Sequence, residues 1–122
     1  MYKEIKVGEK IVPMLCTAAT PLRYKLIFGK DLITELQGAE LDSAKVMDSV
    51  PELAFLMAKT AEAKAGKADL NRLSQEMLLD WLDQFDAMDL PLASEEIISL
   101  YAGNMLTTSE PKKNTKGKVK ES

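Results

Sequence analysis

The chain has 122 residues, of which 46% are apolar and 29% charged, and its formal net charge is −3. These values predict a soluble, globular protein with one domain. The sequence contains no histidine and a single cysteine, Cys16. A histidine-based active site is therefore excluded, an intramolecular disulfide cannot form, and a zinc site is not expected. We expect Cys16 to be a small buried residue.

The charges are unevenly distributed along the chain. Residues 1–109 carry 11 Lys and Arg against 17 Asp and Glu, a net −6, whereas residues 110–122 carry a net +3. A nucleic-acid-binding domain usually needs a basic face, which this acidic body does not suggest. Residues 1–10 are too charged for a signal peptide, and no apolar run approaches the length of about 18 residues that a membrane span requires. We therefore expect a cytoplasmic protein without nucleic-acid or membrane partners.

The first predicted element is a β-hairpin over residues 2–16. Ile5 and Val7 alternate with charged residues, Gly8 interrupts the pattern, and a second apolar run follows. Pro13 cannot donate to a strand ladder, so it should lie at an edge or a bulge. An isolated hairpin is marginally stable in water, so a helix should cover its apolar face.

A helix is predicted over residues 20–37, because Thr20 can cap it and Pro21 suits its first turn. Gly38 should end this helix. Four apolar residues at helical spacing suggest that this helix is central to the fold. They are Leu22, Leu26, Ile33 and Leu36.

The motif "FGKD" within this helix raises the question of a phosphate-binding loop. Such a loop needs several glycines and a Ser or Thr after the lysine, whereas here Gly29 stands alone and Asp31 follows Lys30. The carboxylate would repel a phosphate group. We interpret Gly29 as either a point of close helix approach or a short break in the helix, with Lys30 and Asp31 in solvent.

Three further helices are predicted over residues 43–65, 70–89 and 94–105. Pro51 lies inside the first of them and indicates either a kink or a separate helix capped by Ser49. Ser94 is the expected cap of the last helix, after a loop. The fold class is therefore α+β and mainly α, with the hairpin packed on a bundle of about four helices. The domain should cover residues 1–106, and the lysine-rich residues 107–122 should form a disordered basic tail.

One helical stripe is a candidate partner-binding surface. Trp81, Phe85 and Met88 follow i, i+4, i+7 spacing, which is typical either of a core or of a groove for a partner helix. Met77 and Tyr101 join them as candidate contact residues. The chain has seven methionines, whose flexible side chains suit adaptable contact surfaces.

The aspartates at positions 80, 83, 86 and 89 invite a metal or acid–base interpretation. A spacing of three drifts around a helix, so the four carboxylates cannot converge on one ion, and a solvated face is favoured. A hydrolase using Asp80 and Asp83 is the alternative with an enzymatic activity. We assign no catalytic, cofactor-binding or metal-binding residue, and we expect no enzyme.

The segments "TPLRYKLIFGKDL", "PELAFLMAKTA" and "LLDWLDQF" together resemble the tail assembly chaperones of long-tailed phages and prophages of Gram-positive bacteria. The resemblance covers about residues 1–105. It implies a protein of the host bacterial cytoplasm that binds the phage tape measure protein, keeps it soluble until the tail tube assembles, and is absent from the mature virion. It also implies a longer, frameshifted form of the same chain as a partner, and it leaves homo-oligomerisation open. The alternatives are a structural tail or connector protein of the virion and a small helical adaptor protein.

Overall fold

A computed structural model describes residues 1–41 and 43–109, and for residues 38–41, 43–47 and 105–109 only the backbone is described. The hairpin consists of β1 (Tyr2–Val7) and β2 (Lys10–Leu15). The helices are α1 (Thr20–Phe28), α2 (Leu32–Leu41), α3 (Ser43–Lys64), a 3₁₀ turn η1 (Leu70–Arg72), α4 (Gln75–Leu82) and α5 (Asp89–Ser109). The predicted fold class, α+β and mainly α with an N-terminal hairpin on a helical bundle, is confirmed.

The hairpin pairs in continuous antiparallel register from Tyr2 opposite Leu15 to Val7 opposite Lys10. Gly8 has a φ of 64°, a left-handed conformation that glycine adopts without strain, so it permits the two-residue turn. Alternation along the strands places Ile5, Val12 and Met14 on the buried inner face. Pro13 lies opposite Glu4 in continuous register, so the strand has no bulge there. Of the two predicted positions for Pro13, an edge or a bulge, the edge is therefore correct.

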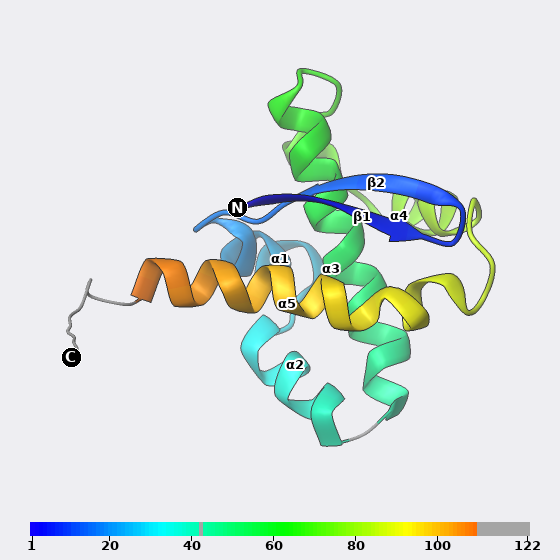
Figure 1. The fold of residues 1–122 in the computed structure, drawn as a ribbon. Coiled ribbons are helices and arrows are strands. Elements are labelled where there is room, and N and C mark those ends of the chain that lie inside the picture. The colour runs from blue at the N-terminus through cyan, green and yellow to red at the C-terminus, as the bar shows by residue number, and fades with distance from the viewer. Residues whose placement is uncertain (42, 110–122) are drawn as a thin grey trace.

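The long helix α3 runs through the centre of the molecule, and the other elements surround it (Figure 1). β2 and α2 pack against α3, and α5 contacts both α3 and β1. The segment Leu53–Ala58 of α3 is buried at every position. A helix that is buried all round belongs to the core, so α3 is the central helix of this fold.

The prediction of one central helix over residues 20–37 is wrong. The chain breaks at Gly29, whose φ of 71° ends α1, and a second helix begins at Leu32. This break divides the predicted apolar stripe, so Leu22 is 60% exposed and Leu26 is 75% exposed. Tyr24 and Leu32 are buried in their place. Gly38 lies inside α2 and does not end it.

Two other predicted helices begin or end elsewhere. The helix predicted over 70–89 is reduced to η1 and α4, because Ser74 caps α4 with its hydroxyl, which accepts a hydrogen bond from the Met77 amide at 3.2 Å. The helix predicted to begin at Ser94 begins at Asp89. Pro91 lies in its first turn, where a missing N–H costs nothing.

The remaining expectations concern Pro51 and the C-terminus. Helix α3 continues through Pro51, so the separate helix capped by Ser49 is wrong. Helix α5 extends to Ser109, three residues into the segment predicted to be disordered. The rest of the predicted basic tail, residues 110–122, lies outside the described residues.

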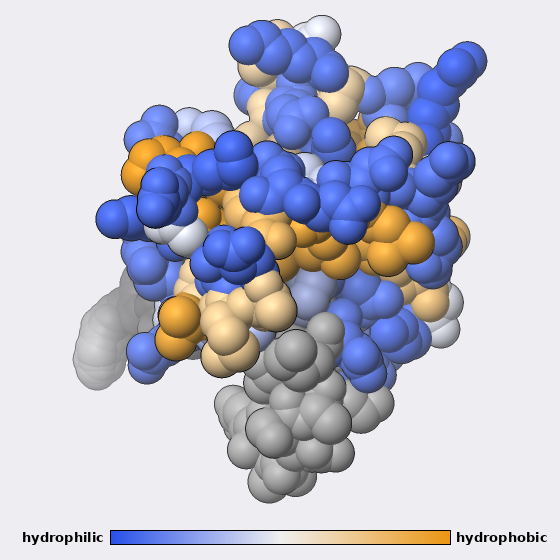
Figure 2. Space-filling view, turned by 90° about the vertical axis from the view of Figure 1, so that its right-hand side faces the viewer, coloured by the Kyte–Doolittle hydropathy of each residue, from blue (hydrophilic) through white to orange (hydrophobic). Residues whose placement is uncertain are grey.

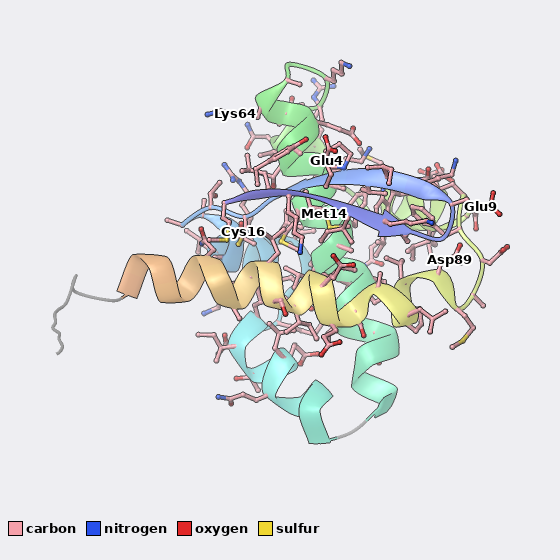
Figure 3. All side chains as sticks on the ribbon, viewed as in Figure 1. Glu4, Glu9, Met14, Cys16, Lys64 and Asp89 are labelled. Atoms are coloured by element: carbon pink, nitrogen blue, oxygen red, sulfur yellow. The ribbon has the colours of Figure 1, made fainter. Side chains whose placement is uncertain are left out.

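The turn at Gly8 yields a stability prediction, because a Cβ at this position would overlap the Asp89 carboxylate. Figure 3 shows Asp89 beside the hairpin turn. We expect Gly8→Ala to lower the free energy of unfolding by about 2–3 kcal/mol, from left-handed strain and from displacement of Asp89. Gly66→Ala is the matched control: its φ is 78°, but no described atom lies within 4 Å of the added Cβ. It should cost about 1 kcal/mol. Urea denaturation measures both, and equal losses would contradict the role of Asp89.

Candidate functional site: a groove between the hairpin and helix α3

Two adjoining hollows follow strand β2, with volumes of about 520 and 500 Å³. They share Val12, Pro13 and Glu62 in their walls, so together they form one groove, which we call the hairpin groove. β2 forms one side of it, and the C-terminal half of α3 forms the other (Figure 1). The far end is closed by α4.

The walls of the hairpin groove are mainly apolar at its α3 end. Three alanines of α3 lie at i, i+3 and i+7, and face a wall from the hairpin. The alanines are Ala58, Ala61 and Ala65, and the hairpin wall consists of Tyr2, Val12, Pro13 and Leu15. Tyr2 is held at the rim because its hydroxyl donates a hydrogen bond to Glu4 at 3.2 Å. Small side chains on one wall and larger ones on the other leave room for a third element.

The free edge of β2 is poorly suited to pairing with another strand. Within the described residues, β2 pairs with β1 alone. The pair that closes a two-residue turn is hydrogen-bonded, and pairs alternate from there, so Glu4 and Pro13 form a non-hydrogen-bonded pair. Pro13 therefore turns its backbone nitrogen, which carries no N–H, toward the free edge. An incoming strand would lack a donor at the middle of β2.

The charge of the hairpin groove is opposite to that of the acidic body. Four lysines line it, against two carboxylates. The lysines are Lys10, Lys59, Lys64 and Lys67, and the carboxylates are Glu62 and Asp80. Lys59 and Glu62 form a salt bridge at 3.1 Å, so they largely cancel. Lys64 projects from the end of α3 above the hairpin (Figure 3).

Two of the five residues predicted to contact a partner line the hairpin groove, and a third, Phe85, packs beside one of them. Met77 and Trp81 line the α4 end of the hairpin groove. Trp81 is only 8% exposed, and its ring packs edge-on against Phe55 at 5.8 Å and Phe85 at 5.0 Å. Phe85 also lines a separate hollow of about 180 Å³ beside Pro51. Trp81 is thus mainly a core residue whose edge reaches the groove.

The other two predicted contact residues lie apart from the groove. Met88 is 57% exposed, in the turn before α5, and does not line the groove. Tyr101 is 4% exposed in the core, and its hydroxyl finds no hydrogen-bond partner within the described part of the chain. Burial raises the pKa of this hydroxyl.

Figure 2 shows the face with the hairpin turn and the start of α5, where orange apolar surface interrupts the blue.

The "FGKD" motif belongs to a polar cluster that joins α1, α2 and α3. Lys30 lies 2.9 Å from the Glu52 carboxylate and 3.9 Å from that of Glu35. Tyr24 donates a hydrogen bond to Glu52 at 2.6 Å, and Ser49 donates one to Glu35 at 3.0 Å. Lys30 therefore links the turn between α1 and α2 to Glu35 of α2 and to Glu52 of α3. The expectation that Lys30 lies in solvent is correct only in part, because 35% of its side chain is exposed but its ammonium group is paired.

Asp31 caps helix α2, which the sequence interpretation also missed. Its carboxylate accepts hydrogen bonds from the Ile33 amide at 3.2 Å and from the Thr34 hydroxyl at 3.1 Å. Gly29 marks a break and not a close approach, because no described atom lies within 4 Å of an added Cβ. Each residue of "GKD" thus has a local structural role in the turn from α1 to α2.

The four aspartates at 80, 83, 86 and 89 do not form a site together. The first three are exposed, and the Asp89 carboxylate accepts a hydrogen bond from the Asp86 amide at 2.9 Å. Across residues 1–41 and 43–109, no group of three or more Cys, Asp or Glu side chains is placed to hold a metal ion. Cys16 is buried, and this burial raises the pKa of its thiol.

The sequence interpretation missed most of the hairpin groove. Tyr2, Leu15 and the alanines of α3 were assigned to no site, although the small residues at i, i+3 and i+7 were visible in "AKTAEAKAG". The spacing of these alanines predicts no site by itself, because they form a groove wall only when the hairpin lies beside them. Lys64 and Lys67 likewise carry no sequence pattern that indicates a site.

Searches of protein-family models, of curated proteins and of solved structures found no match to this chain. The resemblance to tail assembly chaperones therefore remains a prediction. Among the described helices, none is both long enough and apolar enough to cross a membrane. The candidate binding surface in this structure is the hairpin groove.

The position of Trp81 predicts a large stability effect. We expect Trp81→Ala to lower the free energy of unfolding by about 3–5 kcal/mol, because it removes the ring packed between Phe55 and Phe85. Met88→Ala should change it by less than about 0.5 kcal/mol, because Met88 is exposed. Thermal unfolding followed by circular dichroism measures both. A Trp81→Ala protein as stable as Met88→Ala would show that Trp81 is a surface residue.

The buried tyrosine of the polar cluster predicts a pH dependence. Burial and the neighbouring Glu52 raise the pKa of Tyr24 in the folded protein, so the unfolded chain loses this proton first as the pH rises. The free energy of unfolding should be insensitive to Tyr24 below about pH 9. Above about pH 10, it should fall by up to about 1.4 kcal/mol per pH unit through this group. Tyr24→Phe should make the alkaline decline shallower in urea denaturation, and parallel curves would contradict the argument.

Proposed function

We propose that this protein is a tail assembly chaperone of a long-tailed phage or prophage, which binds the tape measure protein in the host cytoplasm and keeps it soluble. The resemblance of "TPLRYKLIFGKDL" and the two later segments to that family supports the proposal. The structural observation that carries it is the hairpin groove, an open and mainly apolar channel between a strand and a helix. A longer, frameshifted form of the chain would present the same groove.

A groove of this kind suits the task of covering a long apolar helix surface. A tape measure protein is a long helical chain, whose apolar stripe lacks a partner until the tail tube forms around it. A chaperone must cover that stripe reversibly and along its length. Many copies of a small domain, each binding weakly through one groove, achieve this by avidity. Met77 at the α4 end adds a flexible side chain that accommodates varied partner sequences.

Co-expression tests the proposal. The tape measure protein of the same phage should stay soluble when it is produced together with this chain, and it should precipitate when it is produced alone. Ala65→Trp should abolish the effect, because this substitution fills the apolar end of the groove. Ala102→Trp is the matched control, since Ala102 is also an exposed alanine but lies on α5, outside the groove. Both variants should keep the helical circular-dichroism spectrum.

A structural tail or connector protein is the main alternative. Mass spectrometry of purified phage particles separates the two functions, because a chaperone should be absent from finished virions. Stoichiometric amounts of this chain in the particle would overturn the proposal. The proposal would also be overturned if the tape measure protein stayed soluble when it was produced without this chain.

A further inference from the structure

We propose that the occupant of the hairpin groove is an amphipathic α-helix whose apolar stripe is flanked by acidic side chains. This inference rests on the proposed function in one respect, since it names the chemistry of the segment that the chaperone would bind. It rests independently on the shape, the edge chemistry and the charge of the groove.

The shape and length of the groove suit a short helical segment. The six residues of β2 span about 20 Å, and an α-helix of about 13 residues covers the same length. Ala61 and Ala65 present small side chains beside the buried Ala58, which allow the backbone of a second helix to approach α3 closely. Leu15 and Tyr2 then face the apolar stripe of that helix from the hairpin side.

The edge chemistry disfavours the other common occupant, an extended peptide. A strand added to β2 would meet Pro13 at the centre of the edge and lose one backbone hydrogen bond there. A helix satisfies its own backbone groups and needs only side-chain contacts from the groove. Because Pro13 has no N–H to offer to an added strand, we expect the groove to bind a helix in preference to an extended peptide.

The positive charge of the hairpin groove favours a bound helix with acidic side chains beside its apolar stripe. The body of residues 1–109 has a net charge of −6, yet the groove is lined by four lysines and two carboxylates. Glu62 is already paired with Lys59. Lys64 and Lys67 are exposed at the apolar end, and within the part of the chain that the structure describes neither forms a salt bridge. Carboxylates beside the apolar stripe of a bound helix would meet these two ammonium groups.

Binding of two matched synthetic peptides tests the inference. Both have about 20 residues, enough for a stable helix, and carry the same Ala/Leu stripe. One has glutamates on both flanks, and the other has lysines at the same positions. Fluorescence anisotropy with the full chain should show tighter binding of the glutamate peptide. That binding should weaken as salt is raised, because exposed charges are screened beyond about 10 Å at 0.1 M salt.

Charge reversal in the protein supplies the internal control. The double variant Lys64→Glu with Lys67→Glu should bind the glutamate peptide about tenfold more weakly and the lysine peptide more tightly than the unmodified protein does. Lys6→Glu with Lys25→Glu makes the same change in net charge at exposed positions outside the groove, and should leave the preference intact. Because all four lysines are exposed, the variants should fold, which circular dichroism verifies.

Two results would overturn the inference: equal binding of the two peptides, or binding of neither peptide. Both leave the proposed function testable, because co-expression with the tape measure protein does not depend on the charge of the partner. Conversely, a preference for the glutamate peptide in a protein that fails the co-expression test would retain the groove and its acidic partner and reject the chaperone role.

Discussion

The fold depends on covering one segment of helix α3. Leu53–Ala58 is buried on every side, so α3 cannot exist as a surface helix, and the hairpin, α2, α4 and α5 each cover part of it. The dependence is mutual, because a two-stranded hairpin is marginal in water unless its apolar face is packed. Phe55 of α3 is fully buried and packs edge-on against Trp81 of α4. The turn at Gly8, tight against Asp89, aligns the hairpin with the start of α5.

The same arrangement explains why a groove remains. The hairpin crosses α3 near its middle, and the C-terminal half of the helix continues beyond the free edge of β2 (Figure 1). At that end α3 changes from large apolar residues to alanines and lysines, which do not fill the space. The polar cluster around Lys30 lies on the other half of α3 and has its hydrogen bonds satisfied internally. Of these two features, it is the groove that has unfilled apolar surface.

The sequence predicted the elements better than their placement. Alternation around Gly8 was sufficient for the hairpin, and helical spacing was sufficient for α3. The sequence left the break at Gly29 as one of two alternatives, and the pairing of Lys30 with Glu52, from a distant part of the chain, could not be predicted from the sequence. The early start of α5 was missed because Pro91 suggested a loop, although a proline fits a first turn equally well. The groove could not be predicted, since its walls come from residues that are unremarkable until the hairpin and α3 lie side by side.

Site-specific photo-cross-linking tests the central claim most directly. A photoreactive residue at position 61 lies on the α3 wall of the groove, and one at position 25 lies on the exposed face of α1. In cells that also produce the tape measure protein, the account predicts a cross-linked product from position 61 and none from position 25. A product from position 25 alone would show that partners bind the α1 surface and would contradict the assignment of the hairpin groove.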